Sequence, residues 1–265
     1  MAESTNNTVL TDITDNGVAT ITLNRVDKSN AFDASIIQSL THEIDTLSSD
    51  IGIRCLVLRG NGKHFSAGAD LHWMKSMANK SKQENQDDAV QLAKLMQALD
   101  NFPHPTIAVV HGSAFGGALG LICCCDIALG TESSIFCLSE VKIGLIPATI
   151  GPYVCRAIGQ RHARRYMLTG ERIEAKTAVD IGLLHYLCSH NTLQESLNHI
   201  LKQILSNSPA AVSKAKTLCQ LCDSTPIDTA LINETSQMIA DIRVSKQGQE
   251  GLNAYFEKRL PNWVK

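Results

Sequence analysis

Residues 111–121, HGSAFGGALGL, carry the strongest fold signal in this 265-residue sequence. A strand-like segment runs into them, a helix-like segment leaves them, and small residues gather between the two: Gly112, Gly116, Gly117, Ala118 and Gly120. Glycines at such a junction let the backbone approach a ligand closely, and the first N–H groups of a helix have no partner inside it. The stretch is typical of an α/β fold whose helix start binds an anion or a developing oxyanion. Close packing of the helix against a sheet explains the same glycines.

Strand-like and helix-like segments alternate on both sides of this stretch. Strands are predicted over residues 18–23, 53–58, 106–110, 126–129 and 135–136. The spacing of apolar residues predicts helices over residues 33–47, with Asp33 as N-cap, over 86–99 and over 117–124. Because parallel strands need a covering element at each crossover, this order predicts an α/β fold with a largely parallel sheet.

The sequence after about residue 150 is mostly helical in pattern. Helices are predicted over residues 153–158, 162–168, 175–181, 193–205, 209–222, 227–242 and 246–258, and one strand-like segment covers 183–187. A helical layer at this end of the chain serves either oligomer contacts or closure of a site, and the pattern fits both.

Composition excludes several classes of function. The 24 Lys and Arg residues nearly balance the 26 Asp and Glu residues, and a net charge of −2 creates no overall field for nucleic acid or an anionic membrane. Asp126 interrupts the apolar stretch 116–129, which leaves it too short to span a membrane. The polar start MAESTNNT lacks the pattern of a secretion signal. We therefore expect a cytoplasmic protein whose nine cysteines are reduced and buried, with no metal or redox site at the C-x-x-C pair Cys219 and Cys222.

A second glycine-containing loop, residues 63–71 (KHFSAGADL), also joins a predicted strand to a helix. Ser66 lacks the first glycine of the G-x-S-x-G nucleophile elbow, which argues against a serine hydrolase. We expect Asp70 to cap the following helix and the loop to offer a backbone N–H group. Two such loops on neighbouring strands would place two N–H donors on one carbonyl oxygen, the arrangement that stabilises an enolate or a tetrahedral oxyanion.

Glu140 lies among apolar residues in LSEVKIGLIP, residues 138–147. Burial in that setting would raise the pKa of its carboxyl and suit it to act as a general base or acid, although an exposed loop glutamate would look the same. His72 and His111 are expected to be structural. The sequence lacks both G-x-G-x-x-G and G-x-x-x-x-G-K-[ST], which argues against a nicotinamide cofactor or a nucleoside triphosphate.

Seven segments together resemble the crotonase family, the enoyl-CoA hydratase/isomerase group. In chain order they are LNRVDKSNAF, FSAGADL, HGSAFGGALGL, CDIAL, FCLSEVKIGLIP, LTGERIEAKTAVDIGLL and EGLNAYFEKRLP. The resemblance implies a spiral of ββα units with an acyl-CoA site over residues 1–200 and a helical oligomerisation region over 201–265. It further implies a homotrimer or a hexamer made as a dimer of trimers, with coenzyme A as part of the substrate and no other cofactor.

The resemblance also implies roles for individual residues. The oxyanion hole falls on the N–H groups of Ala67 and Gly117, and Glu140 matches a catalytic glutamate. The substrate path would be lined by Gly68, Ala69, Asp70, Leu71 and Gly116. Tyr255 and Lys258 match positions that reach the coenzyme A of a neighbouring subunit, and Lys28 is a phosphate candidate.

The chain departs from the family at Gly120, where hydratases commonly carry a first glutamate. The segments nevertheless resemble bacterial methylglutaconyl-CoA hydratases of leucine degradation, and we expect hydration of 3-methylglutaconyl-CoA or a related branched enoyl-CoA. Three alternatives stay open: a double-bond isomerase that needs one glutamate, a decarboxylase of the same fold, and an inactive acyl-CoA-binding or RNA-associated scaffold. The net charge of −2 offers no broad nucleic-acid surface.

Overall fold

A computed structural model describes residues 8–223 and 225–264, so the expectation for the start of the chain concerns residues almost wholly outside the described ones. Its main sheet has the strand order β1-β2-β3-β4-β6-β9. The strands are β1 (Val9–Ile13), β2 (Val18–Leu23), β3 (Cys55–Gly60), β4 (Thr106–Val110), β6 (Ile127–Thr131) and β9 (Tyr186–Cys188). Only the β1–β2 pair in this sheet is antiparallel, which confirms the predicted α/β fold with a largely parallel sheet.

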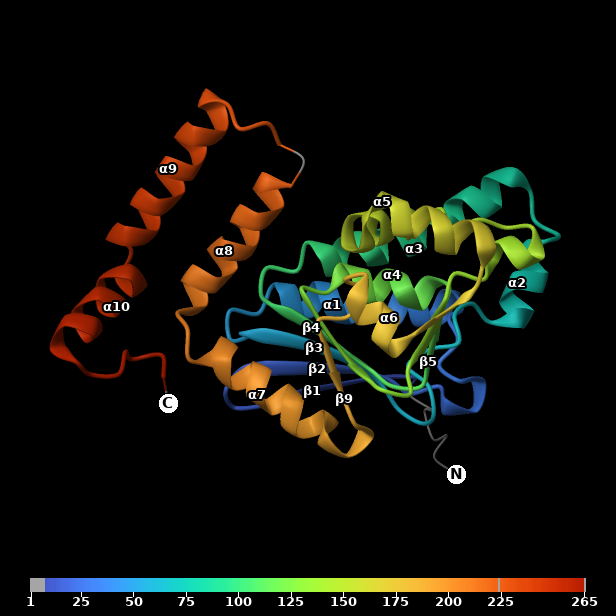
Figure 1. Ribbon diagram of the computed structural model, residues 1–265, viewed down its shortest axis with the longest axis horizontal. Helices are drawn as coiled ribbons and strands as arrows, with labels where there is room; N and C mark the ends of the chain where they lie inside the picture. The colour runs from blue at the N-terminus through green and yellow to red at the C-terminus, as the bar shows by residue number, and fades with distance from the viewer. Residues whose placement is uncertain (1–7, 224, 265) are drawn as a thin grey trace.

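A smaller sheet, in the order β5-β7-β8, lies beside the main one (Figure 1). Its strands are β5 (Ser113–Phe115), β7 (Ile135–Cys137) and β8 (Arg172–Glu174). β5 is parallel to β7, and β7 is antiparallel to β8. Because β5 leads into the glycine-rich helix start and β7 leads towards Glu140, this sheet brings two predicted site segments together.

Helices cover both faces of the main sheet (Figure 1). On one face lie α1 (Ala34–Ser48), α3 (Lys82–Asp100), α4 (Gly117–Cys124), α5 (Gly151–Thr169) and α6 (Ala175–Asp180). On the other face, α7 (Leu193–Leu205) packs Leu193, Leu197 and Ile200 against Val57, Val109 and other sheet residues. Short helices complete this part of the chain, namely α2 (Leu71–Met77), η1 (Val26–Lys28), η2 (Glu140–Ile143) and η3 (His190–Thr192).

The last three helices extend away from the sheets as an arm (Figure 1). They are α8 (Pro209–Cys222), α9 (Thr229–Val244) and α10 (Lys246–Glu257). The Lys216 ammonium fixes α8 to the body through an ion pair of 2.8 Å with Asp126. α7 runs across the domain boundary expected at residue 200 and packs on the sheet, so the arm begins only with α8.

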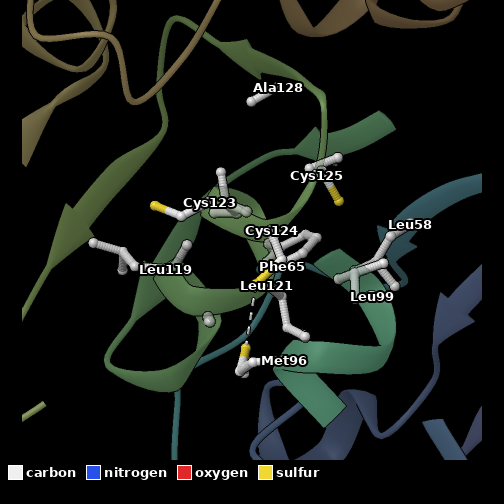
Figure 2. Packing of buried hydrophobic residues seen from close by; sticks show 14 of the residues in the cluster. Leu58, Phe65, Met96, Leu99, Leu119, Leu121, Cys123, Cys124, Cys125 and Ala128 are labelled. Carbon is white, nitrogen blue, oxygen red and sulfur yellow. Dashed lines mark hydrogen bonds between the residues drawn. The ribbon is translucent and has the colours of Figure 1, made fainter. Parts of the chain in front are cut away.

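Buried cysteines help to anchor α4 (Figure 2). Cys123, Cys124 and Cys125 are buried, and the Cys124 thiol contacts the Met96 sulfur of α3 at 3.9 Å. Burial raises the pKa of the Cys123 thiol to about 12, so these thiols are apolar packing groups rather than nucleophiles. The expectation of burial is wrong for Cys219 and Cys222, which are exposed on α8, and Cys155 and Cys188 are only half-buried.

Candidate active site

The two glycine-containing loops run side by side. In chain order, the first loop is residues 63–71 and the second loop is residues 111–117. A parallel bridge joins Ser66 to Ala114, the Ser66 N–H donates to the Ser113 carbonyl oxygen at 3.2 Å, and the Phe115 N–H donates to the Ser66 carbonyl oxygen at 3.1 Å. The loops therefore meet as the predicted oxyanion site requires.

The amides of the first loop point in alternating directions, which decides which of them can reach a ligand. The Ala67 N–H already donates to the Ser29 carbonyl oxygen at 2.9 Å, so this amide is not free to bind the substrate oxygen that we expected it to hold. Ala69 forms a parallel bridge with Phe32, in which the hydrogen bonds come from the residues on either side of Ala69. The Ala69 N–H thus points away from Phe32, and it has no hydrogen-bond partner within residues 8–223 and 225–264.

The second loop delivers its amide at the start of α4. Gly116 is the N-cap residue, with φ +52°, and Gly117 is the first helical residue. A first-turn N–H has no intrahelical acceptor, and the Gly117 N–H finds none elsewhere in the described part of the chain. Gly117 is partly exposed, so a ligand can reach this donor.

Gly68 lets the loops approach each other. Its φ of +90° is one that other residues rarely adopt, and a Cβ atom there would lie 2.7 Å from the Phe115 carbonyl oxygen. The glycine therefore sets the separation between Ala69 on one loop and Gly117 on the other.

The Glu140 carboxylate lies against the second loop. A Cβ atom at Gly116 would lie 3.1 Å from Glu140 Oε1. The carboxylate therefore lies against Gly116, the residue directly before the Gly117 amide. Glu140 Oε2 is buried without a hydrogen-bond partner among the described residues. Burial raises the pKa of Glu140 above its ordinary value of 4.5, as expected for a general base or acid held out of water.

The position of the missing glutamate is closed by core side chains. A Cβ atom at Gly120 would lie 2.3 Å from Ile150 Cγ2 and 2.9 Å from Met96 Sδ. α4 therefore has no room for a second carboxylate at this point, whereas the Glu140 carboxylate lies against Gly116.

We expect Gly120→Ala to lower the free energy of unfolding by about 1–3 kcal/mol, because the added methyl group overpacks this contact. Alanine elsewhere in a helix normally stabilises relative to glycine, so the sign is diagnostic. Gly151→Ala is the matched control, since a Cβ atom there meets nothing within 4 Å. Urea denaturation measures both variants, and an unchanged stability in Gly120→Ala would show that Ile150 and Met96 leave space.

The other predicted residues lie in two places, beside the first loop and on the arm. Asp70 caps α2 by accepting hydrogen bonds from the His72 and Trp73 N–H groups, as expected, and it pairs with Arg25 at 3.2 Å. Leu71 is exposed on α2 directly after the first loop, and Lys28 is exposed beside Ser29. Tyr255 lies on α10 of the arm and Lys258 is the C-cap of this helix, which lies at the opposite end of the molecule from α2 (Figure 1).

Comparison with known proteins shows the family of the chain. The family model described as enoyl-CoA hydratase/isomerase matches residues 13–265. The chain belongs to the enoyl-CoA hydratase/isomerase family. Relatives of this family are named enzymes, so the chain is assigned a crotonase-type reaction on an enoyl-CoA thioester.

Relatives in the family cover the whole described fold. A crystal structure of an enoyl-CoA hydratase from Shewanella pealeana is 47% identical, has a TM-score of 0.94, and overlaps 98% of this chain and 97% of its own. The human mitochondrial enoyl-CoA hydratase domain-containing protein 3 is 32% identical over 93% of this chain and 80% of its own length. A Dictyostelium discoideum mitochondrial Δ(3,5)-Δ(2,4)-dienoyl-CoA isomerase is 31% identical over 92% of this chain and 86% of its own. The crotonase-like fold is thereby confirmed.

The sequence analysis missed two features of the site, and only the second had a signal in the sequence. The hydrogen bond that occupies the Ala67 amide comes from Ser29, which lies in a distant segment of the chain. Ala69 could have been found from its place before the N-cap Asp70, because a capping residue and its predecessor are extended and alternate amides then point to opposite sides.

Within the described residues, no helix is long and apolar enough to cross a membrane.

Proposed function

We propose that the protein adds water to the double bond of a 2-enoyl-CoA thioester. One observation carries the proposal: the half-buried Glu140, whose Oε2 is buried without a hydrogen-bond partner among the described residues, lies against the loop that presents the free Gly117 amide. This combination supplies both a base and an oxyanion site, which the reaction requires.

In this proposal the N–H groups of Ala69 and Gly117 hold the thioester oxygen. Attack at the β carbon turns the thioester into an enolate, so negative charge grows on that oxygen as the transition state forms. Donors fixed before the reaction stabilise this charge, each by about 10²–10³-fold in rate. The Ala69 amide replaces the Ala67 amide that the family resemblance suggested, because Ala67 is bonded to Ser29.

Glu140 moves the proton. As a water O–H bond breaks, the carboxylate accepts the proton and the water oxygen bonds to the β carbon. The protonated Glu140 then gives a proton to the α carbon, and the enolate returns to a thioester. The closed space at Gly120 supports a mechanism in which one carboxylate performs both transfers.

We infer that neighbouring subunits complete the binding of coenzyme A in a homotrimer or hexamer. The arm leaves apolar side chains exposed, including Ile232, Ile239 and Val244, which supports its packing on another subunit. Tyr255 and Lys258 would then reach the coenzyme A held by the neighbour, beside the exposed Lys28 of that subunit. Cytoplasmic localisation and the absence of nucleic-acid partners stay predictions.

We propose 3-methylglutaconyl-CoA or a related branched enoyl-CoA as the substrate, in leucine degradation. Its second carboxylate needs a cation near the acyl tail. Arg156 is engaged by Asp100 in an ion pair, whereas Lys75 of α2 and Lys142 of η2 are exposed. Of these two, Lys75 lies on α2, the helix that follows the first loop. We therefore assign the contact with the carboxylate of the acyl tail to Lys75.

A comparison of 3-methylglutaconyl-CoA with crotonyl-CoA tests the substrate. We expect a higher kcat/KM for the carboxylated substrate, and Lys75→Gln should reduce that preference by about tenfold while leaving crotonyl-CoA turnover unchanged, since one charge contact is lost. Lys142→Gln is the control. A higher kcat/KM for crotonyl-CoA in the unaltered protein would contradict the branched, carboxylated substrate.

Double-bond isomerisation is the second candidate reaction. It needs the same oxyanion site and one carboxylate to carry a proton between carbons, and the 31% identity to the Dictyostelium dienoyl-CoA isomerase favours keeping it. Product analysis separates the two, because only hydration yields a 3-hydroxyacyl-CoA.

A further inference from the structure

We propose that His64 is a positioning residue: hydrogen bonds between the starts of the two loops fix where the Ala69 and Gly117 N–H groups lie. This inference rests on the proposed function. His64 lies at the start of the first loop, and its imidazole Nδ1 lies 3.1 Å from the Ser113 main-chain nitrogen of β5. A main-chain N–H can only donate, so Nδ1 must accept and the ring proton must sit on Nε2.

His111 makes the reverse connection. Its Nε2 lies 2.9 Å from the Gly62 carbonyl oxygen, and a carbonyl oxygen can only accept, so Nε2 of His111 must carry a proton. Each histidine therefore bonds the main chain of the other's segment, once as acceptor and once as donor. The pair fixes the start of the parallel run that ends at Ala69 and Gly117.

Register at the start of this run controls the donors at its end. Ser113 is held through both of its main-chain groups, because its N–H donates to His64 and its carbonyl oxygen accepts from Ser66. A Cβ atom at Gly112 would lie 2.1 Å from the Lys63 carbonyl oxygen, so the segments are already in close contact here. Loss of the His64 acceptor would leave the Ser113 N–H unpaired and let β5 shift relative to Ser66.

The histidines lie outside the reaction space. They line a cavity of about 430 Å³ together with Lys63, His190 and other residues, and Ala69, Gly117 and Glu140 are not among its lining residues. The rings of His111 and His190 meet edge to face with centroids 6.3 Å apart. Substitutions at His64 can therefore change the loops without touching the acyl-CoA.

Three variants test the role of His64 in the full-length protein. Asparagine places an amide oxygen near the position of Nδ1, so His64→Asn keeps the acceptor, whereas His64→Leu removes it. His190→Asn alters the same cavity without touching the bond to Ser113. The readouts are kcat and KM on a 2-enoyl-CoA and amide hydrogen exchange over residues 112–116, followed by mass spectrometry.

We expect His64→Leu to lower kcat by about ten- to a hundredfold with a smaller change in KM, because the donors move relative to the reacting oxygen. Exchange over residues 112–116 should rise about tenfold. His64→Asn should restore both readouts to near the wild-type values, and His190→Asn should change neither.

The outcomes separate this inference from the proposed function. Wild-type kcat and exchange in His64→Leu would overturn the positioning role, as would equal losses in the leucine and asparagine variants. If the wild-type protein fails to convert any 2-enoyl-CoA, the proposed hydration falls, while the exchange measurement still decides whether His64 holds the loop.

Discussion

Glu140→Gln should lower kcat on a 2-enoyl-CoA by about 10²–10⁴-fold, the range typical of losing a general acid–base group. Glutamine keeps the size and polarity of the side chain but cannot accept the proton of the attacking water. Binding of the acyl-CoA should persist, because the amides of Ala69 and Gly117 are unchanged. Steady-state kinetics and a separate binding measurement check both statements, and wild-type turnover in a folded Glu140→Gln protein would contradict the role of this residue.

The pH dependence of Glu140 gives an independent control. Because burial raises its pKa above 4.5, the native protein holds this proton more tightly than the unfolded chain does. The stability cost of the partly buried Glu140 carboxylate is therefore absent below pH 4.5 and fully present above the raised pKa. Glu140→Gln should show a higher Tm than the wild type above that range, with the difference closing as pH falls, while wild-type activity declines as Glu140 becomes protonated.

Gly117→Pro should lower kcat by about 10²–10³-fold, the typical loss for one oxyanion donor. Proline removes the N–H group, and it is well tolerated at the first position of a helix, which Gly117 occupies in α4. Its ring also fills the place where the substrate oxygen would bind.

Gly117→Ala is the matched control, because it adds a side chain and keeps the donor. A Cβ atom at Gly117 would lie 3.4 Å from Phe32 Cδ2, at the edge of ordinary contact, so we expect turnover within a few-fold of wild type. Circular dichroism and kcat measure fold and activity in both variants. Equal turnover in the proline and alanine variants would remove the Gly117 amide from the mechanism.

Local pattern was sufficient for the bounds of β2, β4, α4, α7 and α8. In β2 and α7 the spacing of apolar residues follows from which face is covered, whereas β4 and α4 are continuous buried apolar runs. The helices predicted over residues 153–158 and 162–168 form one element, α5, bent at Gly159 with φ +73°. The strand expected over residues 183–187 begins only at Tyr186.

Short strands had no local signal because pairing alone creates them. β5 and β8 each have three residues, and both exist through contacts with β7. β1 is an edge strand with one buried residue, Val9, so it lacks the alternation of a half-buried strand.

The candidate site was predicted in its parts but not in two details of its geometry. Small residues in both loops and an acid among apolar neighbours indicated the oxyanion site and the burial of Glu140. Which amide of the first loop is free depends on Ser29, and tertiary hydrogen bonds of this kind leave no pattern in the sequence. The same holds for Ile150, whose side chain closes the space beside Gly120.

Conversion of a 2-enoyl-CoA in water enriched in the heavy oxygen isotope tests the central claim most directly. The proposed chemistry predicts a 3-hydroxyacyl-CoA whose new hydroxyl oxygen carries the label, formed by the wild-type protein and lost in Glu140→Gln. An unlabelled product with a shifted double bond, or binding of the thioester without any conversion, would contradict it.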